Sequence, residues 1–401
     1  MSNKKFFYGW IIVVAGVMLV YLDGLLLYSF GVLLPSIQEK FDLTKALVNS
    51  IFAVRCLVFA FSMVVFGRLI DRHKPEKIIF LGGVICALGL FLTAYSETKI
   101  GLFINYGILP GIGDGAFYIP AVAIAQRWFN KRRDFVVGII TAGVPISGLT
   151  ISPLSAFILD NASLESTLIC LAIIAFIFSF AAFLMKESPE ELGLEPYGGP
   201  FPTQKKHESN AWSTIEAVKT VPFFILYLLM IFGMLAFLIV ITLQFDYALS
   251  KNLGLLAASA APAAIAVGSL CGRLVTGYLA EFTHRVKILF LVFLGQGLSI
   301  LIIINANDIL SYIIFGIIFG FCYGGWIPIF PSKLKDFFGT ANAGQIFGVF
   351  GTSFSISAII GPPLAGFLVD QFDTYLYGLY FSMTVCLIGA SIALFVRKPI
   401  K

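Results

Sequence analysis

The sequence predicts an all-α integral membrane protein with twelve transmembrane helices arranged as two pseudo-symmetric six-helix bundles. An apolar composition, twelve long apolar stretches and an internal repeat lead to this fold class. Of the 401 residues, 59% are hydrophobic and only 12% are charged, whereas a soluble globular chain carries roughly 25% charged residues. With a mean hydropathy of +0.94, the chain lacks the charge that covers a water-soluble surface. The composition therefore excludes a soluble enzyme, a disordered protein and a disulfide scaffold.

Each predicted span can cross a bilayer, because a hydrocarbon core of about 30 Å requires roughly 20 apolar residues. The first span follows a basic segment at residues 1–5 and is too long for a signal peptide, so we expect it to stay in the mature chain. The predicted spans, in chain order, are 9–36, 47–70, 77–96, 101–126, 134–159, 165–185, 222–248, 255–280, 287–305, 309–332, 343–369 and 374–396.

The distribution of basic residues predicts the orientation of these spans. Alternate loops and both termini hold 21 of the 27 Lys and Arg residues, whereas the opposite loops hold four, and Arg55 and Arg273 lie inside spans. Because cytoplasmic loops of membrane proteins are enriched in Lys and Arg, both termini are predicted to be cytoplasmic. We expect a multi-pass protein of the plasma membrane, or of the inner membrane if the chain is bacterial. Basic residues spread over loops in this way do not indicate nucleic-acid binding.

One long polar stretch, from about Lys186 to Lys219, interrupts the series of spans. It contains four prolines and a Gly198–Gly199 pair, which is typical of a linker. The chain is therefore divided into an N-terminal six-helix bundle at residues 1–186, a cytoplasmic linker at 187–220 and a C-terminal six-helix bundle at 221–401.

The two halves repeat at an offset of 210 residues. Gly67–Asp71 aligns with Gly277–Glu281, and Pro153-Leu154 with Pro363-Leu364. Two separate patches that share one offset predict two parallel copies related by an axis along the membrane normal. Binding sites in such proteins lie near the bilayer midplane, between the halves.

Short motifs connect the chain to a known family. Gly67-Arg68-Leu69-Ile70-Asp71-Arg72 resembles the loop 2–3 signature of the major facilitator superfamily, and Gly277–Glu281 resembles its second-half counterpart. This resemblance covers nearly the whole chain. A narrower resemblance, to the monocarboxylate and oxalate/formate porter branch, rests on Tyr8-Gly9-Trp10, Tyr28-Ser29-Phe30-Gly31-Val32, Arg127-Trp128-Phe129 with Arg132-Arg133, and Gly272-Arg273 followed by Gly277.

The resemblance implies a major facilitator fold and secondary active transport by alternating access. The expected substrate is a small monocarboxylate such as lactate, pyruvate, acetate or formate, and the expected coupling ion is the proton. Two alternatives remain open: an exporter of lipophilic drugs or metabolites, and an anion exchanger of the oxalate/formate type. A non-transporting membrane sensor is disfavoured, because the segments outside the spans are too short for a signalling domain.

Arg273 is the main candidate for substrate binding. A charge at the centre of a membrane helix costs about 2.5–3.5 kcal/mol on insertion scales, so such residues default to functional hypotheses. The guanidinium stays protonated and offers a fork of donors that matches a carboxylate. The competing interpretation is a structural ion pair with a buried acid. In many animal relatives an acid precedes this arginine by four residues, but Ser269 stands there in this chain, so a proton site would lie elsewhere.

Two carboxylates inside predicted spans are the candidates for proton coupling. Asp23 lies in the first span and is either a proton carrier or the partner of a salt bridge, for example with Arg55 in the second span. Asp114 lies in the fourth span and shares a helix face with Tyr118. For Asp114 we favour a structural pair with Arg55, because both lie in the first half.

The other predicted substrate-binding residues are neutral. Tyrosine offers an apolar wall and one hydrogen bond, which suits a short organic anion, although a packing role is common. Gln244 stands where the resembling family often has His, so a proton relay through this position is in doubt. The neutral set comprises Tyr118, Tyr323, Gln244, Ser269, Tyr28, Phe350 and Ser353.

Two further features refine these expectations. The eleventh span lacks the second cation of the oxalate-type relatives, which favours a monoanion over a dicarboxylate. The six cysteines are scattered singly, so we expect neither a metal site nor a cofactor. The loop signatures predict cytoplasmic ion pairs across the halves that hold the outward-open state. The residues concerned are Arg68, Asp71, Arg72 and Glu281 together with the Arg127/Arg132/Arg133 cluster. Topology determination by basic loops is the alternative, and both interpretations can hold at once.

Overall fold

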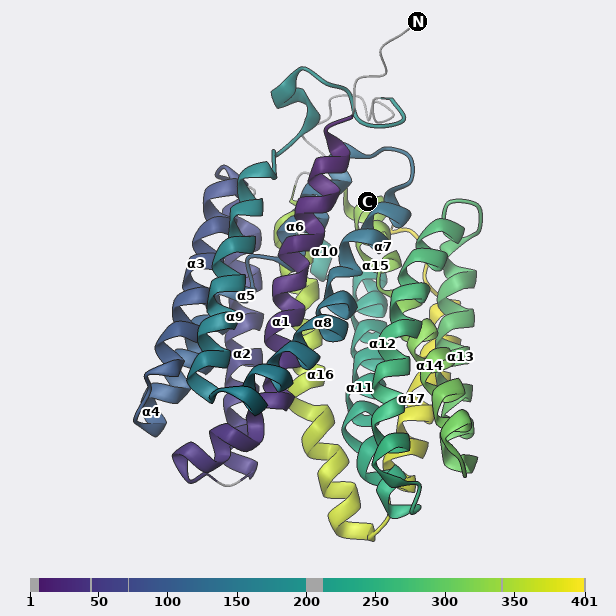
Figure 1. The fold of residues 1–401 in the computed structure, drawn as a ribbon. Coiled ribbons are helices and arrows are strands. Elements are labelled where there is room, and N and C mark those ends of the chain that lie inside the picture. Colours follow the sequence, from purple (N-terminus) through teal and green to yellow (C-terminus); the bar gives the residue numbers. More distant parts are fainter. Residues whose placement is uncertain (1–6, 44, 71, 200–211, 340–341, 400–401) are drawn as a thin grey trace, which may run out of the picture.

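The structure, a computed structural model, describes residues 7–43, 45–70, 72–199, 212–339 and 342–399. Within these ranges the chain is almost entirely helical (Figure 1). The elements in chain order are α1 (Gly9–Phe41), α2 (Lys45–Ile70), α3 (Pro75–Ala94), α4 (Lys99–Leu102), η1 (Phe103–Ile108), α5 (Leu109–Asp114), α6 (Tyr118–Trp128), α7 (Arg133–Thr141), α8 (Gly143–Asn161), α9 (Leu164–Ser179), η2 (Phe180–Leu184), η3 (Pro189–Leu192), α10 (Thr214–Val218), α11 (Val221–Ser250), α12 (Gly254–Leu279), α13 (Arg285–Asn305), α14 (Ile309–Trp326), α15 (Ile329–Phe338), α16 (Ala343–Phe372) and α17 (Leu376–Ala393).

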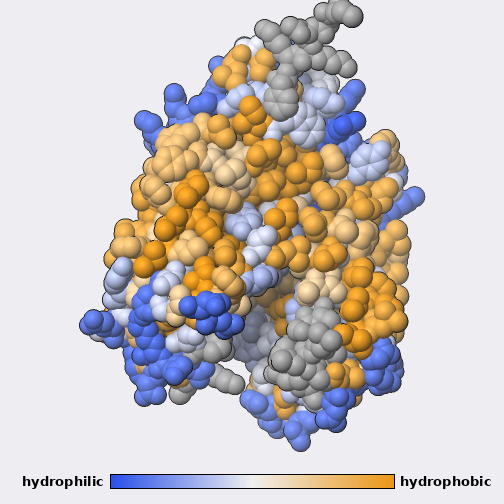
Figure 2. All heavy atoms as spheres, in the orientation of Figure 1, coloured by the Kyte–Doolittle hydropathy of each residue, from blue (hydrophilic) through white to orange (hydrophobic). Residues whose placement is uncertain are grey.

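Twelve helical segments in the described part of the chain are long and apolar enough to cross a membrane. The prediction of an all-α protein with twelve spans is therefore confirmed. Figure 2 shows the matching surface, a broad apolar belt between two hydrophilic ends. The fourth span departs from one continuous helix, since α4, η1, α5 and α6 follow one another between Lys99 and Trp128. η1 is a single π-helical turn, an irregularity that is frequent near functional sites.

The two halves stand side by side, and the start of α1 and the end of α17 lie at one end of the molecule, which we call the terminal end (Figure 1). Polar side chains begin several spans at the opposite end. Asp308 accepts a hydrogen bond from the Ser311 amide ahead of α14, and Ser163 accepts one from the Ser166 amide ahead of α9. These N-caps satisfy amide groups that the first helical turn leaves without partners.

Helices within the second half pack through glycines. On α12, a Cβ added at Gly268 or Gly272 would meet the backbone of α14, and on α14, a Cβ added at Gly320 or Gly324 would meet the backbone of α12. Such small residues let two helix backbones approach closely in lipid, where apolar side chains gain little from each other. α12 and α14 therefore form a closely packed pair.

Two helix pairs, α2 with α16 and α7 with α12, form the main contacts between the halves. A Cβ added at Gly67 would meet the carbonyl oxygen of Gly344, and one added at Gly277 would lie 2.6 Å from that of Asp134. The first contact becomes the second when 210 is added to Gly67 and subtracted from Gly344. The interface between the halves therefore follows the offset of the sequence repeat.

The described parts of the linker region pack on the two helical bundles. Residues 187–199 pack on the first half, where the amide of Tyr197 donates to the carbonyl oxygen of Trp128 at 2.8 Å. Residues 212–220 pack on the second half, where Asn342 Nδ2 donates to the carbonyl oxygen of Trp212 at 2.9 Å. Residues 200–211, between these two docked segments, lie outside the described residues.

Candidate functional site

A cavity lies between the two halves of the molecule. It offers about 100 Å³ to the centres of water-sized spheres, and by this measure one water needs roughly 10–15 Å³. The cavity is thus large enough for a small organic molecule. Its lining comes from α1, α2, α5, α6 and α8 in the first half and from α11, α12, α14, α15 and α16 in the second.

Arg273 on α12 lines this cavity and is 2% exposed. Its guanidinium donates to the carbonyl oxygen of Thr141, at the end of α7 in the other half, and its Nε donates to Ser269 Oγ at 3.3 Å. Both partners are neutral, and the described residues provide no ion pair for Arg273. The alternative of a structural ion pair therefore has no support among the described residues.

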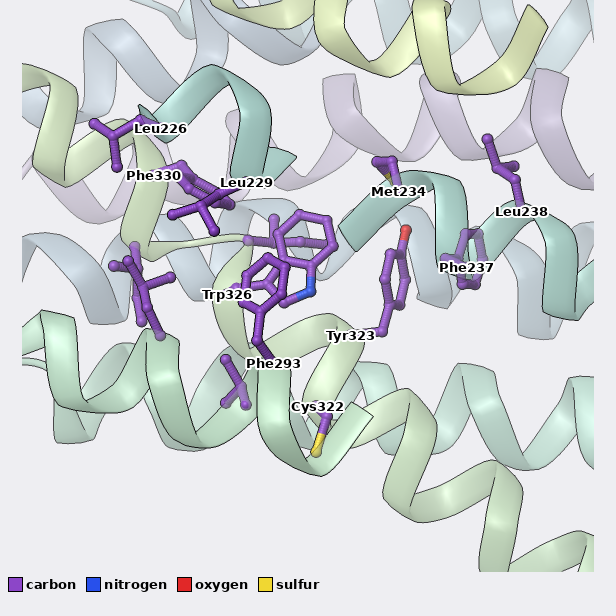
Figure 3. Packing of buried hydrophobic residues seen from close by; sticks show 14 of the residues in the cluster. Leu226, Leu229, Met234, Phe237, Leu238, Phe293, Cys322, Tyr323, Trp326 and Phe330 are labelled. Atoms are coloured by element: carbon purple, nitrogen blue, oxygen red, sulfur yellow. The ribbon is translucent and has the colours of Figure 1, made fainter. Parts of the chain in front are cut away.

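Aromatic contacts form the wall next to Arg273. Figure 3 shows Tyr323 between Phe237 and Trp326. The ring of Tyr323 on α14 stacks on Phe237 with a centroid distance of 3.9 Å and an interplanar angle of 6°, and it meets Trp326 edge-on at 5.4 Å. Trp326 Nε1 donates to Gln296 Oε1 at 2.9 Å, which holds the indole in place. Arg273 Cζ lies 6.0 Å from the Tyr323 ring centroid, at the limit of a cation–π contact.

A second charged cluster lines the cavity from the first half. Arg55 on α2 forms a buried ion pair with Asp114 at the end of α5, as expected from their shared half. Asp114 Oδ1 and Arg55 Nε have no hydrogen-bond partner among the described residues. Asp23 on α1 lies close enough to interact electrostatically with Asp114, Arg55 and Arg273. Two carboxylates thus share one arginine at close range.

Four charged residues stand among the described residues that line the cavity: Asp23, Arg55, Asp114 and Arg273. With all four ionised, the formal charges cancel. Addition of one proton to a carboxylate leaves a net charge of +1. The cavity can therefore accept one proton together with one negative charge and stay neutral, an arrangement that avoids an uncompensated charge in the membrane.

Most of the remaining wall is apolar. Phenylalanine and methionine side chains from both halves dominate it, with Tyr118 and Tyr323 as the tyrosines. Sequence reasoning missed most of this wall, because it named only Phe350 among the apolar lining residues. The missed phenylalanine and methionine residues are Phe52, Phe59, Met63, Met230, Met234, Phe330, Phe347 and Phe354.

The predicted neutral site residues separate into two groups. Tyr118, Tyr323 and Phe350 line the cavity, whereas the other four lie outside its lining. Among these four, Ser269 contacts Arg273 directly, and Tyr28 is close enough to Arg273 to interact electrostatically. The Ser353 hydroxyl donates to the carbonyl oxygen of Phe350. Gln244 is fully buried, and its side-chain amide has no partner among the described residues.

Ion pairs join the halves at the terminal end. Arg285 at the start of α13 binds Asp134 of α7, with Nη2–Oδ2 at 2.6 Å, and Asp336 of α15, with Nη1–Oδ2 at 2.5 Å. A further ion pair joins Arg133 Nη1 to Asp336 Oδ1 at 3.5 Å. Lys335 also donates to the carbonyl oxygen of Gln126 in the first half. The halves are therefore bound together on this side, whereas the surface is hollowed between them on the opposite side (Figure 2).

The predicted gating residues contribute little to this network. Arg68 and Arg72 are exposed and form no ion pair with another described residue, and Asp71 lies outside the described residues. Glu281 is near Asp134, Arg132 and Arg285 without a hydrogen bond to its buried Oε1. Sequence reasoning missed the pairing of Arg285 with Asp134 and Asp336; charged residues next to the ends of apolar spans were the available signal.

Comparison with known proteins gives concordant matches. The family model described as Major Facilitator Superfamily matches residues 13–352 and 268–401. The chain is 25% identical over 339 residues to the "Uncharacterized MFS-type transporter YhjX" of Escherichia coli (strain K12), covering 83% of this chain and 81% of that protein. It is 24% identical to Monocarboxylate transporter 11 of Mus musculus (91% and 82% covered) and 22% identical to Monocarboxylate transporter 2 of Homo sapiens (98% and 86% covered).

Proposed function

The chain belongs to the major facilitator superfamily and is a multi-pass membrane transporter, not an enzyme, and from this premise we propose that it carries a small monocarboxylate together with a proton. The proposed substrates are short acids such as lactate, pyruvate, acetate and formate. Monocarboxylate transporters among its relatives support this substrate class at 22–24% identity.

The observation that carries the proposal is the environment of Arg273. Its guanidinium lies at the cavity wall, contacts two neutral oxygens and has no acidic partner among the described residues. A carboxylate is the anion that fits a planar fork of N–H donors. One carboxylate would supply the charge that Arg273 lacks, and the stacked Tyr323 would form the adjacent wall.

In this proposal the transported proton binds to one of the two cavity carboxylates, Asp23 or Asp114. Asp114 is occupied by Arg55, so Asp23 is the group free to gain a proton without breaking an ion pair. Protonated Asp23 gives the cavity a formal charge of +1, and the monoanion cancels it. Proton and substrate would then cross the membrane as an electroneutral pair, which is the basis for proposing symport.

We further propose that residues 1–186 and 221–401 rock as two units around this site, joined by the linker at 187–220. If the terminal end is cytoplasmic, as the basic loops predict, the structure corresponds to an outward-facing state closed by the Arg285 and Arg133 ion pairs. Release of substrate into the cell would then require these pairs to break.

A second candidate function is export of lipophilic molecules. It is favoured by the apolar wall, in which phenylalanine and methionine residues far outnumber charged ones. A dicarboxylate exchanger receives less support, because α16 carries no Lys or Arg and the other cavity arginine, Arg55, is already paired.

The test is uptake of labelled lactate into proteoliposomes with an inward proton gradient. Arg273→Ala should reduce uptake by at least about a hundredfold, since hydrogen bonds to a charged group contribute roughly 1.5–3 kcal/mol and the unpaired substrate charge adds to this loss. Arg397→Ala, at an exposed arginine near the end of the chain, is the matched control and should keep wild-type uptake. Wild-type uptake by correctly inserted Arg273→Ala would refute the proposal, and preference for lipophilic cations would favour the second candidate.

A further inference from the structure

We propose that Met63, Ile119 and Gly351 form a subsite for the alkyl end of the substrate and that this subsite sets the accepted chain length. The proposal rests on the proposed monocarboxylate function and deepens it. The ligand would be an amphiphilic monoanion, with its carboxylate on Arg273 and its hydrocarbon end on the first half of the molecule.

The position of Met63 follows from the pseudo-symmetry of the fold. Met63 and Arg273 are separated by 210 residues, the offset of the sequence repeat. Their backbone contacts are equivalent as well: a Cβ added at Gly138 would meet the carbonyl oxygen of Arg273, and one added at Gly348 would lie 2.6 Å from the carbonyl oxygen of Met63. Both side chains line the same cavity. Met63 is therefore the counterpart, in the first half, of the proposed carboxylate-binding arginine.

The surroundings of Met63 are apolar and closely packed. A Cβ added at Gly351 would lie 2.6 Å from Met63 Sδ, 3.1 Å from Met63 Cε and 3.6 Å from Ile119 Cδ1. Phe59 and Phe354 meet edge-on at 5.9 Å and line the same cavity. A second carboxylate placed here would face a thioether and methyl groups without a donor, and its desolvation would be uncompensated. A hydrocarbon chain fits this wall.

The geometry also predicts which substitutions change the size of the subsite. A methyl group at Gly351 would displace the flexible end of Met63 toward the cavity, because the thioether adapts more easily than backbone. Truncation of Met63 would instead enlarge the subsite. Burial of one methylene strengthens binding about fourfold, so affinity should rise with chain length until the subsite is full, and the length at which it stops rising reports the size of the subsite.

The experiment measures how acetate, propionate, butyrate, valerate and hexanoate compete with labelled lactate in proteoliposomes. Relative to the wild type, Gly351→Ala should move the best competitor to an acid at least one carbon shorter, and Met63→Ala to one at least one carbon longer. Ile119→Val is the mildest of the changes, because it removes a single methyl group and leaves room for one more methylene of the ligand. It should strengthen competition by the next longer acid about fourfold. Gly366→Ala is the matched control, because it lies on α16 as well and an added Cβ there meets nothing within 4 Å.

The outcomes separate the two levels of the proposal. If the wild type shows a chain-length preference that all three subsite variants retain, the subsite is refuted and the proposed function stands. If no acid competes in the wild type, the proposed function fails and the subsite with it. Should Met63→Ala not insert into the membrane, Ile119→Val still decides the question, since an unchanged competition profile for that variant contradicts the subsite.

Discussion

The two halves of the molecule share a backbone plan but differ in chemistry. The contacts that bring α2 against α16 and α7 against α12 are related by the repeat, and both use glycine at the point of closest approach. The buried charges follow no such rule. Arg55 and Asp114 form an ion pair in the first half, whereas Ile265 and Gly324 stand at the positions 210 residues later.

This difference indicates which features the fold requires and which serve the substrate. Close backbone approach leaves no room for a Cβ, so these positions are constrained equally in both halves. Side chains that line the cavity have no such restriction. Arg273 in the second half and Met63 at the equivalent position of the first half can therefore give one cavity a cationic wall and an apolar wall at related positions.

The largest effect should come from breaking the ion pair that only the first half contains. Asp114→Ala leaves Arg55 buried without its partner, and removing one member of such a pair costs about 3–5 kcal/mol. We expect a large fall in the unfolding temperature of the detergent-purified protein. The double substitution Arg55→Met with Asp114→Leu should recover most of that stability, because well-packed apolar residues replace both charges.

The double variant also separates stability from function. It should fold and keep the proton dependence of uptake, because Asp23 and Arg273 remain at the cavity and their opposite charges still cancel. A single Asp114→Ala variant as stable as the wild type would show that Arg55 finds another partner, and the contrast drawn between the halves would then be wrong.

A smaller effect, equal in the two halves, is expected from the glycine contacts. Gly138→Ala and Gly348→Ala each place a methyl group against a backbone carbonyl of the opposite half. Each should raise the ratio of molecules with an open terminal end to molecules with a closed one about tenfold, which corresponds to 1.4 kcal/mol. Distances between spin labels on the two halves would measure the shift, with Gly366→Ala as control. Clearly unequal shifts would contradict a symmetric interface.

Much of this organisation could be predicted from the sequence. The apolar stretches gave all twelve spans, the offset of 210 matches the contacts between the halves, and the pairing of Arg55 with Asp114 followed from their placement in one half. These features depend on composition and on repeats, both of which a single chain displays directly. Met63 could have been predicted by the same reasoning, because it stands 210 positions before Arg273.

Other parts of the site depend on information that the sequence does not display. The face that an apolar helix turns to a cavity cannot be inferred when every face is apolar, so Gln244 and Ser353 were predicted at the site and lie outside the cavity lining. The breaks in the fourth span were not visible either. The pairing of Arg285 with Asp134 joins residues 151 positions apart, and several charges at the terminal end were equally plausible partners.

The smallest expected effect concerns Glu281, which the repeat relates to Asp71. Its pKa is raised, first by burial and second by the nearby carboxylate of Asp134, while Arg132 and Arg285 act in the opposite direction. A raised pKa means that the closed terminal end holds the proton more tightly than an open end in which Glu281 is solvated. Protonation of Glu281 therefore stabilises the closed terminal end. This stabilisation is fully present at a pH below the usual pKa of a glutamate, and it is lost as the pH rises through the raised pKa.

Glu281→Gln should abolish this part of the pH dependence and keep the terminal end closed at higher pH. One titrating group can change the ratio of open to closed molecules by at most about tenfold per pH unit, and the partial exposure of Glu281 reduces the change further. The measurement is the spin-label distance across the terminal end between pH 4.5 and 7, with Glu190→Gln, at an exposed position on η3, as control. Equal pH slopes in the wild type and in Glu281→Gln would mean that Glu281 does not sense closure, so the ion pairs of Arg285 and Arg133 would be left to hold the halves together.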